Sequence, residues 1–423
     1  MNSAVISLLI FGFCVTLFVI DKLPMATTAI LGCVLMVVFG VCDFKTAFGQ
    51  FASSTVILTA GVMVIGASIS ETGLANTIGE WIIKKTKGSE ARLLTGCYLA
   101  AGLMSAFLTN SAVLAIFIPV IMGLSDTGGK IKPKNIIMPI VFACVIGGAS
   151  TLVGSTQQLT AQGLLEDAGL RMFKTFDFSL VGGTLLLLGL LYCLFIGRKR
   201  GEKIWGDRED AYSDQIPVDK HTDMGRSKQL VMAAIFVCTV ILYITEWLPL
   251  AVTSTAAAIM CIVTGCITQK KAVAKINWNV VGRLAGCLGL SKALDASGGA
   301  ALISEGFLHL VGDNVSPLAL FIICVLLTQV ASEFLLNSTA IIIILPIIIS
   351  IAPPLGLNTY AYALGITLAS AAALSCPLAN STLAMSMTVG YRFRDYFRYS
   401  IFYDIIAFVT IVLMVPAIYG LTA

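Results

Sequence analysis

The sequence predicts an all-α polytopic membrane protein with two inverted-topology repeats, each of five transmembrane helices plus one re-entrant hairpin. Of its 423 residues, 57% are hydrophobic and only 12% are charged, so a water-soluble globule would lack the polar groups to cover its core. Similar segments also recur at a near-constant offset in the two halves. Finally, each half contains one long apolar stretch that is interrupted by a polar pair.

The offset between the halves is almost constant along the chain. Pro249 follows Pro24 by 225 residues (249 − 24), and Asn337 follows Asn110 by 227 (337 − 110). Agreement within two residues over such a length indicates an internal repeat. The polar segment 197–228 separates the two copies.

Apolar runs long enough to cross about 30 Å of hydrocarbon as helices define ten spans. The start of the chain lacks a basic region and continues into further spans, so it is interpreted as a first span and not as a cleaved signal. The expected spans are 3–20, 24–42, 53–70, 135–165 and 179–197 in the first copy, and 229–247, 250–267, 279–296, 359–390 and 400–420 in the second.

Each copy has one further apolar stretch, at 91–124 and 317–351, with a polar break near its middle. Two short helices that meet at a tip fit this pattern. Lysines and arginines flank the first stretch on both sides and are absent from the flanks of the second. The positive-inside rule then predicts that the first hairpin opens to the cytoplasm and the second to the outside. The same rule places the linker 198–228 in the cytoplasm and both termini on the external side. The expected location is the cell membrane, that is, the inner or plasma membrane.

The cysteines and the net charge argue against disulfides, a zinc site and nucleic-acid binding. The twelve cysteines are scattered through apolar runs without a C-x-x-C pair, which disfavours both disulfides and zinc. The net charge of +4 is accounted for by basic loops at one membrane face, and there is no signal for nucleic acid. Membrane lipid is therefore the expected surrounding.

The polar breaks are the candidate functional elements. Non-helical backbone within hydrocarbon is tolerated only where it is buried in protein or lines a watery cavity. Asn110-Ser111 and Asn337-Ser338 stand at helix N-cap positions before the runs AVLAIFIP and TAIIIILP. A single Asn-Ser pair is most simply an interhelical hydrogen-bonding group. Its repetition, with further breaks in GGASTLVGSTQQ and LSCPLANSTLA, favours a binding site.

An anion accompanied by cations suits these breaks. Helix N-termini contribute only about 0.3–1 kcal/mol each towards an anion, too little to replace the hydration of a dianion. A unit charge pair at about 4 Å contributes about 4 kcal/mol at an effective dielectric of about 20. We therefore expect bound cations, and oxygen-rich tips without acids suit a hard ion such as sodium.

The paired S-x-F-L-x-N tips, the GG…T…GST break and the ending TVGYRFRDYF resemble the divalent anion:sodium symporter family of the ion transporter superfamily. The resemblance covers nearly the whole chain. It implies a homodimeric secondary active transporter of small divalent anions, with C4-dicarboxylates as the first choice and sulfate or citrate as alternatives. Sodium is the implied coupling ion, and an elevator movement is the implied mechanism.

The family carries Ser-Asn-Thr at each tip, and here the tips are Thr109-Asn110-Ser111 and Leu336-Asn337-Ser338. Leu336 has no side-chain oxygen, and Gln157-Gln158 replaces the usual Pro-Pro. The residues implied to bind substrate are Asn110, Ser111, Asn337, Ser338, Thr339, Ser155, Thr156, Asn380 and Ser381. Those implied to hold sodium are Ser105, Thr109, Asn110, Gly154, Ser332, Asn337 and Ala379.

An elevator carrier has a fixed scaffold and a sliding transport domain. The resemblance divides the chain into scaffold parts 1–70 and 229–295, arm helices 71–88 and 296–313, transport-domain parts 89–197 and 314–423, and the linker 198–228. The first transport part contains the hairpin 91–124 and the broken helix 135–165; the second contains the hairpin 317–351 and the broken helix 359–390.

Two other classes of function were weighed. A cation/proton antiporter or arsenite-type carrier of the same superfamily needs titratable groups in the membrane, and Glu333 is the one acid near a tip. An intramembrane enzyme is disfavoured, because the spans contain no H-E-x-x-H motif and no Ser/His or paired-Asp arrangement.

Overall fold

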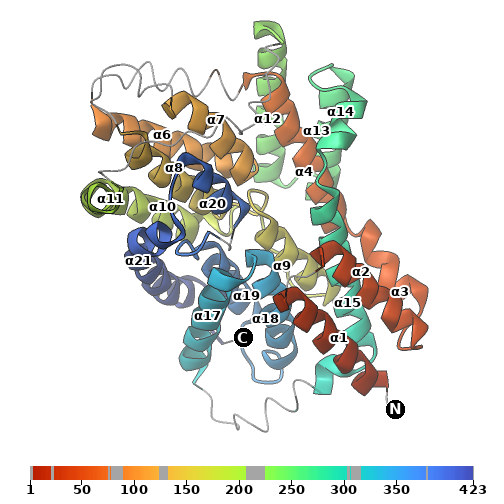
Figure 1. Cartoon of the computed structure of the whole chain (residues 1–423). Helices are drawn as coiled ribbons and strands as arrows, with labels where there is room; N and C mark the ends of the chain where they lie inside the picture. The colour runs from red at the N-terminus through yellow and green to blue at the C-terminus, as the bar shows by residue number, and fades with distance from the viewer. Residues whose placement is uncertain are drawn as a thin grey trace.

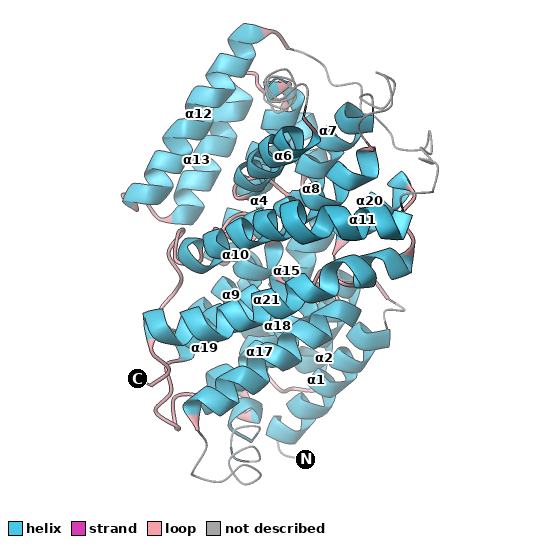
Figure 2. Cartoon of the chain, turned by 90° about the vertical axis from the view of Figure 1, so that its left-hand side faces the viewer, coloured by secondary structure: helices cyan, strands magenta, loops and turns pink. Residues whose placement is uncertain are grey.

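The computed structural model describes residues 3–20, 23–74, 77, 89–122, 132–205, 224–302, 305, 316–377 and 380–422. Throughout these residues the regular elements are helices (Figure 2), apart from an isolated bridge between Leu357 and Thr422. The all-α class predicted from composition is confirmed. The predicted arm helices, 71–88 and 296–313, lie mostly outside the described residues.

The first half of the chain forms helices at the places where apolar runs predict them. Its elements are α1 (Ser3–Ile20), α2 (Met25–Val38), α3 (Phe44–Phe48), a short 3₁₀ turn (Gly49–Ala52), α4 (Ser54–Glu71), α6 (Glu90–Ser105), α7 (Asn110–Met122), α8 (Pro133–Gly148), α9 (Thr156–Asp167), α10 (Ser179–Tyr192), a π-helical turn (Cys193–Gly197) and α11 (Arg198–Trp205). Helix α11 extends into the segment that was expected to be linker.

The second half has helices in a similar order. Its elements are α12 (Arg226–Thr245), α13 (Leu250–Val263), α14 (Gln269–Lys275), α15 (Trp278–Ala296), α17 (Pro317–Phe334), α18 (Asn337–Ile351), α19 (Thr359–Ala371), α20 (Ser381–Ser386), a 3₁₀ turn (Met387–Val389) and α21 (Phe393–Tyr419). Each of the four stretches that was expected to contain a break holds two helices with a break between them: α6 and α7, α8 and α9, α17 and α18, and α19 and α20.

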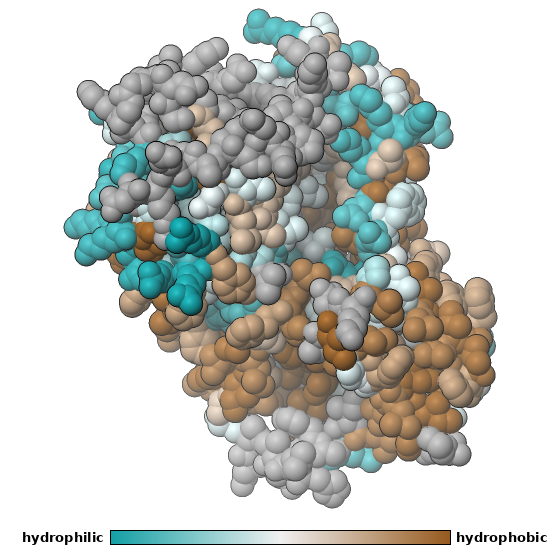
Figure 3. All heavy atoms as spheres, viewed as in Figure 1, coloured by the Kyte–Doolittle hydropathy of each residue, from teal (hydrophilic) through white to brown (hydrophobic). Residues whose placement is uncertain are grey.

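Five helical segments are long and apolar enough to cross a membrane, among the residues that the structure describes. They are Phe44–Glu71, Ser179–Trp205, Arg226–Thr245, Pro317–Phe334 and Phe393–Tyr419, and five shorter apolar helices accompany them. Large apolar side chains such as Phe13, Val38 and Phe44 are exposed on the surface. Figure 3 shows a broad hydrophobic surface over α1–α3 at the lower right. These features describe a multi-pass membrane protein.

The helix ends follow local hydrogen-bonding rules. The Asn358 side chain accepts a hydrogen bond from the backbone N–H of Ala361 and caps α19, and Asn380 caps α20 through the N–H of Thr382. Pro133 and Pro317 stand at the starts of α8 and α17, where the missing N–H costs nothing. The helices that border the breaks are thus specified locally.

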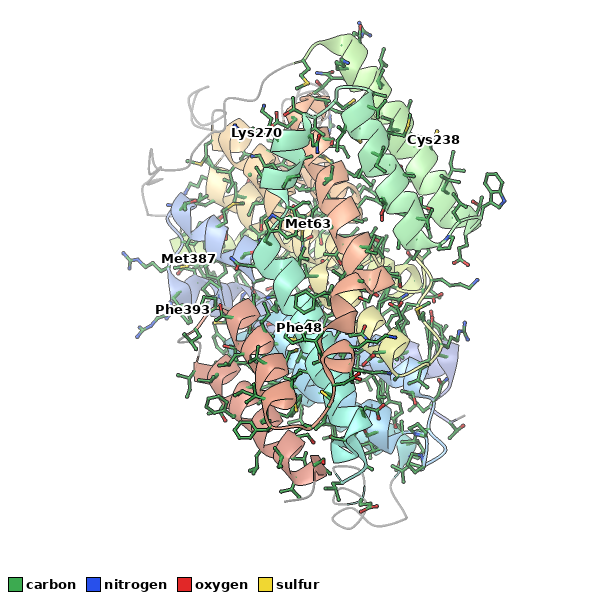
Figure 4. All side chains as sticks on the ribbon, turned by 90° about the vertical axis from the view of Figure 1, so that its right-hand side faces the viewer. Phe48, Met63, Cys238, Lys270, Met387 and Phe393 are labelled. Atoms are coloured by element: carbon green, nitrogen blue, oxygen red, sulfur yellow. The ribbon has the colours of Figure 1, made fainter. Side chains whose placement is uncertain are left out.

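Two groups of helices pack side by side. Helices α1–α4 and α12–α15 lie on one side in Figure 1, and α6–α8, α10, α11, α17 and α21 lie on the other. Within the first group, α2 packs against α15 and α4 against α13, so the two halves of the chain interlock. Figure 4 shows α12 and α13 at an outer edge, with Cys238 on α12. Helix α9 contacts α4, α15 and α18, and so joins the two groups.

Candidate functional site

The first hairpin tip is tied to the first broken helix by buried side chains. Ser105 Oγ, at the end of α6, donates a 2.7 Å hydrogen bond to Asn110 Oδ1 at the start of α7. Asn110 Nδ2 in turn donates to Ser155 Oγ, which precedes α9, at 3.3 Å. All three residues are buried. The tip and the break therefore form one polar cluster within the protein.

Backbone oxygens crowd the same place. A Cβ atom added to Gly154 would lie 2.5 Å from Gly148 O, 2.8 Å from Ser105 O and 2.9 Å from Ala106 O. A Cβ added to Gly148 would lie 2.2 Å from Asn110 Oδ1. Both positions therefore need glycine. Carbonyl and amide oxygens are the ligands that hard cations prefer, so the residues present fit a sodium ion.

The second hairpin tip is different. Asn337 is buried, yet neither Oδ1 nor Nδ2 has a hydrogen-bond partner, and Ser332 Oγ is also buried without one. Leu336 precedes α18 and provides no side-chain cap. Buried polar groups are rarely left unpaired in native proteins. These orphaned oxygens fit a cation, as the implied ligand set requires.

Each hairpin tip contacts the broken helix of the other half. Ser111 Oγ lies 3.2 Å from Ser381 Oγ and 3.1 Å from Thr382 Oγ1 at the start of α20. Thr156 Oγ1, at the start of α9, lies 3.2 Å from Ser338 Oγ. The structure thus pairs hydroxyl groups of the four breaks in two places, one at each hairpin tip.

Arg283 is a site residue that the sequence analysis missed. It belongs to α15, in the other group of helices, and its Nη2 donates a 3.4 Å hydrogen bond to Ser338 Oγ. Its Nη1 lies 3.7 Å from Met25 Sδ, and no described carboxylate forms an ion pair with it. The signal was an arginine within a predicted span, which marks a functional site by default.

Three residues that were predicted to bind substrate or sodium lie outside the polar contacts described above or outside the described residues. Thr109 is exposed, and its carbonyl accepts from the backbone N–H groups of Ala112 and Val113. Thr339 Oγ1 lies 3.3 Å from Met25 Sδ, beside Arg283. Ala379 lies outside the described residues. Neither Thr109 nor Thr339 takes part in the hydroxyl contacts between the tips and the broken helices in the described part of the chain.

The apolar helices and the polar breaks define the class of a multi-pass membrane transporter. The sequence matches the family described as citrate transporter, CitMHS, over residues 15–329 and 240–422, and the chain belongs to this family. It is a member of the divalent anion:sodium symporter group of the ion transporter superfamily, as the resemblance predicted. Its family and relatives are transporters and not enzymes.

Curated relatives agree with this class. The chain is 30% identical to the uncharacterized transporter YfbS of Escherichia coli over 195 residues, which are 46% of this chain and only 32% of YfbS. It is 21% identical to the uncharacterized transporter sll0640 of Synechocystis, covering 98% of this chain and 97% of that protein. It is 23% identical to the sodium-dependent dicarboxylate transporter SdcS of Staphylococcus saprophyticus, covering 80% of this chain and 71% of SdcS.

Two solved structures share the fold. One is the Alcanivorax borkumensis YdaH transporter, with a TM-score of 0.68, 14% identity and 98% coverage of both chains. The other is Neisseria gonorrhoeae MtrF, described as an antimetabolite efflux pump, with a TM-score of 0.62, 12% identity, and coverage of 90% of this chain and 84% of MtrF.

Proposed function

We propose that the protein is a secondary active transporter of small divalent anions, with C4-dicarboxylates as its first substrates and sodium as its coupling ion. The observation that carries this proposal is that each hairpin tip places a hydroxyl group 3.2 Å from a hydroxyl of the other half's broken helix. At the second tip, Arg283, which forms no ion pair with a described carboxylate, also donates to Ser338. The name of SdcS supports both the substrate class and the ion. The family description makes citrate the second candidate.

Charge explains why such a site selects dianions. One carboxylate of the substrate lies near Arg283 and Ser338, and the other lies near Ser111 and Ser381. Arg283 supplies about 4 kcal/mol of attraction at about 4 Å and an effective dielectric of about 20. A single guanidinium balances one of the two negative charges. Sodium at Asn110 and Asn337 supplies the rest, and this balance couples the anion to the cation.

The contact pattern supports two inverted copies around the site. Ser338 follows Ser111 by 227 residues, and Ser381 follows Thr156 by 225. The contact between Ser111 and Ser381 is therefore the repeat equivalent of that between Ser338 and Thr156, and both measure 3.2 Å. A pseudo-two-fold axis through the site accounts for this equality.

An elevator movement fits the two groups of helices, with α1–α4 and α12–α15 as the scaffold of a homodimer. Polar contacts at the end of α9 hold the groups together. Thr55 Oγ1 donates to Glu166 Oε2 at 2.7 Å, and Gln50 Nε2 donates to Asp167 Oδ1 at 2.7 Å. Lys292 Nζ lies 3.4 Å from Asp167 Oδ1. We call these five residues the α9 latch, and an elevator step must break them.

Uptake of radiolabelled succinate into proteoliposomes tests the function. We expect uptake to require an inward sodium gradient and to be abolished by Asn110→Ala and by Asn337→Ala. Malate, citrate and sulfate as competitors rank the substrates. Thermal shifts with each anion, with and without sodium, provide a binding readout independent of turnover. Uptake that neither substitution changes would reject the site.

A further inference from the structure

A groove lies between α17 and α21 on the outer surface of the protein. Its volume is about 820 Å³. The two helices contact each other, and Figure 2 shows both on the face turned to the viewer. Phe393, on the wall of the groove, lies at an outer edge of the molecule beside Met387 (Figure 4). The hydroxyl groups that connect the hairpin tips to the broken helices do not line it. The groove is therefore separate from the candidate substrate site.

Apolar side chains form both walls of the groove. Leu326, Val330 and Phe334 follow one another at intervals of four residues, so they share one face of α17. Most of the apolar lining is exposed, and Phe334 has an exposed fraction of 73%. Between two such walls, one extended hydrocarbon chain is covered on both sides. The wall on α21 repeats the same spacing with Phe393, Phe397, Ile401, Ile405 and Phe408.

One end of the groove is positively charged. Arg394 and Arg398 line it and are four residues apart, so they lie on one face of α21. Arg200 of α11 donates from Nε to the carbonyl oxygen of Arg398 at 3.0 Å, and its Cζ lies 4.4 Å from the centre of the Phe402 ring. None of the three arginines forms an ion pair with a described carboxylate. An anionic group complements this end of the groove.

The charged end is expected at the cytoplasmic face of the membrane. Arg200 stands near the start of the linker 198–228, which the positive-inside rule places in the cytoplasm. Since Arg200 contacts Arg398, the arginines of α21 lie at the same face. Anionic phospholipids give the cytoplasmic leaflet its negative surface potential, and basic pockets between membrane helices bind their headgroups.

The acids on the wall are set apart from the charged end. Glu333 and Asp404 also line the groove. Asp404 comes ten residues after Arg394 in α21, which corresponds to about 15 Å along the helix axis. An anionic headgroup at the start of α21 is therefore closer to the arginines than to this carboxyl group.

We propose that the groove binds one anionic phospholipid, with its phosphate at Arg394 and Arg398 and an acyl chain between α17 and α21. Charge-assisted hydrogen bonds from arginine to phosphate oxygens are among the strongest in proteins. A zwitterionic lipid brings its own positive group to the same arginines, so the groove selects for net negative charge. This site does not depend on the proposed function.

A bound lipid also stabilises the second hairpin. Helix α17 ends at Phe334, two residues before Leu336 at the hairpin tip. A chain that contacts both walls holds this end of α17 against α21. Because the lipid binds only the folded protein, its binding raises the temperature of unfolding.

Native mass spectrometry of the full-length protein tests the headgroup. The protein is exposed to equal amounts of phosphatidylglycerol and phosphatidylcholine with the same acyl chains. The wild type must retain one phosphatidylglycerol per chain with a preference of at least about fivefold, since one arginine near a membrane surface contributes about this factor. Arg394→Gln combined with Arg398→Gln must bring the preference close to one.

Two further variants keep this test decisive. Arg226→Gln combined with Lys270→Gln removes two exposed positive charges on α12 and α14, and it must keep the preference. Arg394→Lys combined with Arg398→Lys retains the charges and must keep most of it, which separates loss of charge from misfolding. A wild type without preference, or a preference unchanged in the glutamine variant or lost equally in the lysine variant, overturns the proposal.

Filling the groove tests the acyl chain. Val330→Trp places a large side chain between the walls without changing charge, so the retained phosphatidylglycerol must be lost. Val263→Trp, at a valine with an exposed fraction of 74% on α13, is the matched control and must keep it. Unchanged lipid retention in Val330→Trp overturns the groove as the site. Unchanged retention together with a smaller dimer fraction would assign the groove to a second copy of the chain.

Thermal unfolding of the lipid-depleted protein distinguishes a lipid from free phosphate. Phosphatidylglycerol must raise the unfolding temperature more than phosphatidylcholine does, and the glutamine variant must lose this difference. Inorganic phosphate must cause no shift, because it has no chain to fill the groove. Equal shifts with both lipids, or a shift with inorganic phosphate that matches that of phosphatidylglycerol, would overturn the lipid site.

Discussion

The two hairpin tips have closely similar sequences but different surroundings. In the first tip, Ser105, Asn110 and Ser155 satisfy one another through hydrogen bonds. In the second, Asn337 and Ser332 are buried with unpaired polar atoms. Leu336 and Arg283 complete the contrast, since one lacks an oxygen and the other adds a positive charge. The comparison teaches that a repeated motif fixes the backbone break, whereas its neighbours decide what the break binds.

Removing the charge beside the second tip is expected to have the largest effect. Arg283→Ala eliminates an attraction of about 4 kcal/mol, so the apparent affinity for succinate falls by about three orders of magnitude. Arg283→Lys keeps the charge without the planar fork and gives an intermediate loss. Concentration-dependent uptake measures both. Near-normal affinity in Arg283→Ala would show that the two tips bind substrate in the same way.

The second-largest effect is expected when a side chain fills the oxygen cluster of the first tip and lowers sodium affinity. Gly154→Ala places a methyl group 2.5 Å from Gly148 O, so we expect sodium affinity to fall by at least about tenfold, or about 1.4 kcal/mol. Gly183→Ala is the matched control, because nothing lies within 4 Å of its added Cβ. Sodium titration of thermal stability reads out both variants, and equal responses would remove sodium from this tip.

Making the two tips more alike is expected to raise sodium affinity, by less than the two preceding substitutions lower affinity. Leu336→Ser restores an oxygen at the second tip, and one added ligand or hydrogen bond contributes about 1 kcal/mol, which is roughly a fivefold rise in sodium affinity. Leu336→Ala controls for loss of the leucine side chain. Sodium dependence of uptake distinguishes them. If both variants behave alike, the missing oxygen at position 336 is irrelevant to the cation.

The smallest effect is expected at the α9 latch. Lys292 and Asp167 are 37% and 6% exposed at their side chains, so their ion pair contributes about 1 kcal/mol or less. A double-mutant cycle of Lys292→Gln and Asp167→Asn, followed by thermal unfolding, isolates this term. The coupling energy should shrink at high salt. Additive single effects would show that the pair does not hold the two groups of helices together.

The sequence predicted the breaks well because their signal is local. An Asn-Ser pair within an apolar run, followed by a new helix, is readable from about ten residues, and Asn110 and Asn337 do begin α7 and α18. Gly154 was named through the family resemblance. The chemistry of these positions as a binding site stays a prediction.

What the sequence did not reveal depends on contacts between distant helices. Arg283 lies 55 positions before Ser338, and no periodicity of α15 tells which helix crosses it. Glu333 was noted as an acid near a tip, but the backbone N–H that donates to it belongs to Ser375, 42 positions further along. Such pairs arise from helix packing, which a single sequence does not encode in its local pattern. The helical character of α11 was likewise hidden by its many charges.

One thiol stands apart from the rest. Of the twelve cysteines, Cys238 is exposed on α12, Cys42 is half-buried, and the others are buried. A lipid-permeant maleimide dye will therefore attach mainly at one position per chain without any engineering. In the proposed homodimer, two such dyes would report the scaffold-to-scaffold spacing by energy transfer, and a dye on α12 would stay still while the carrier works.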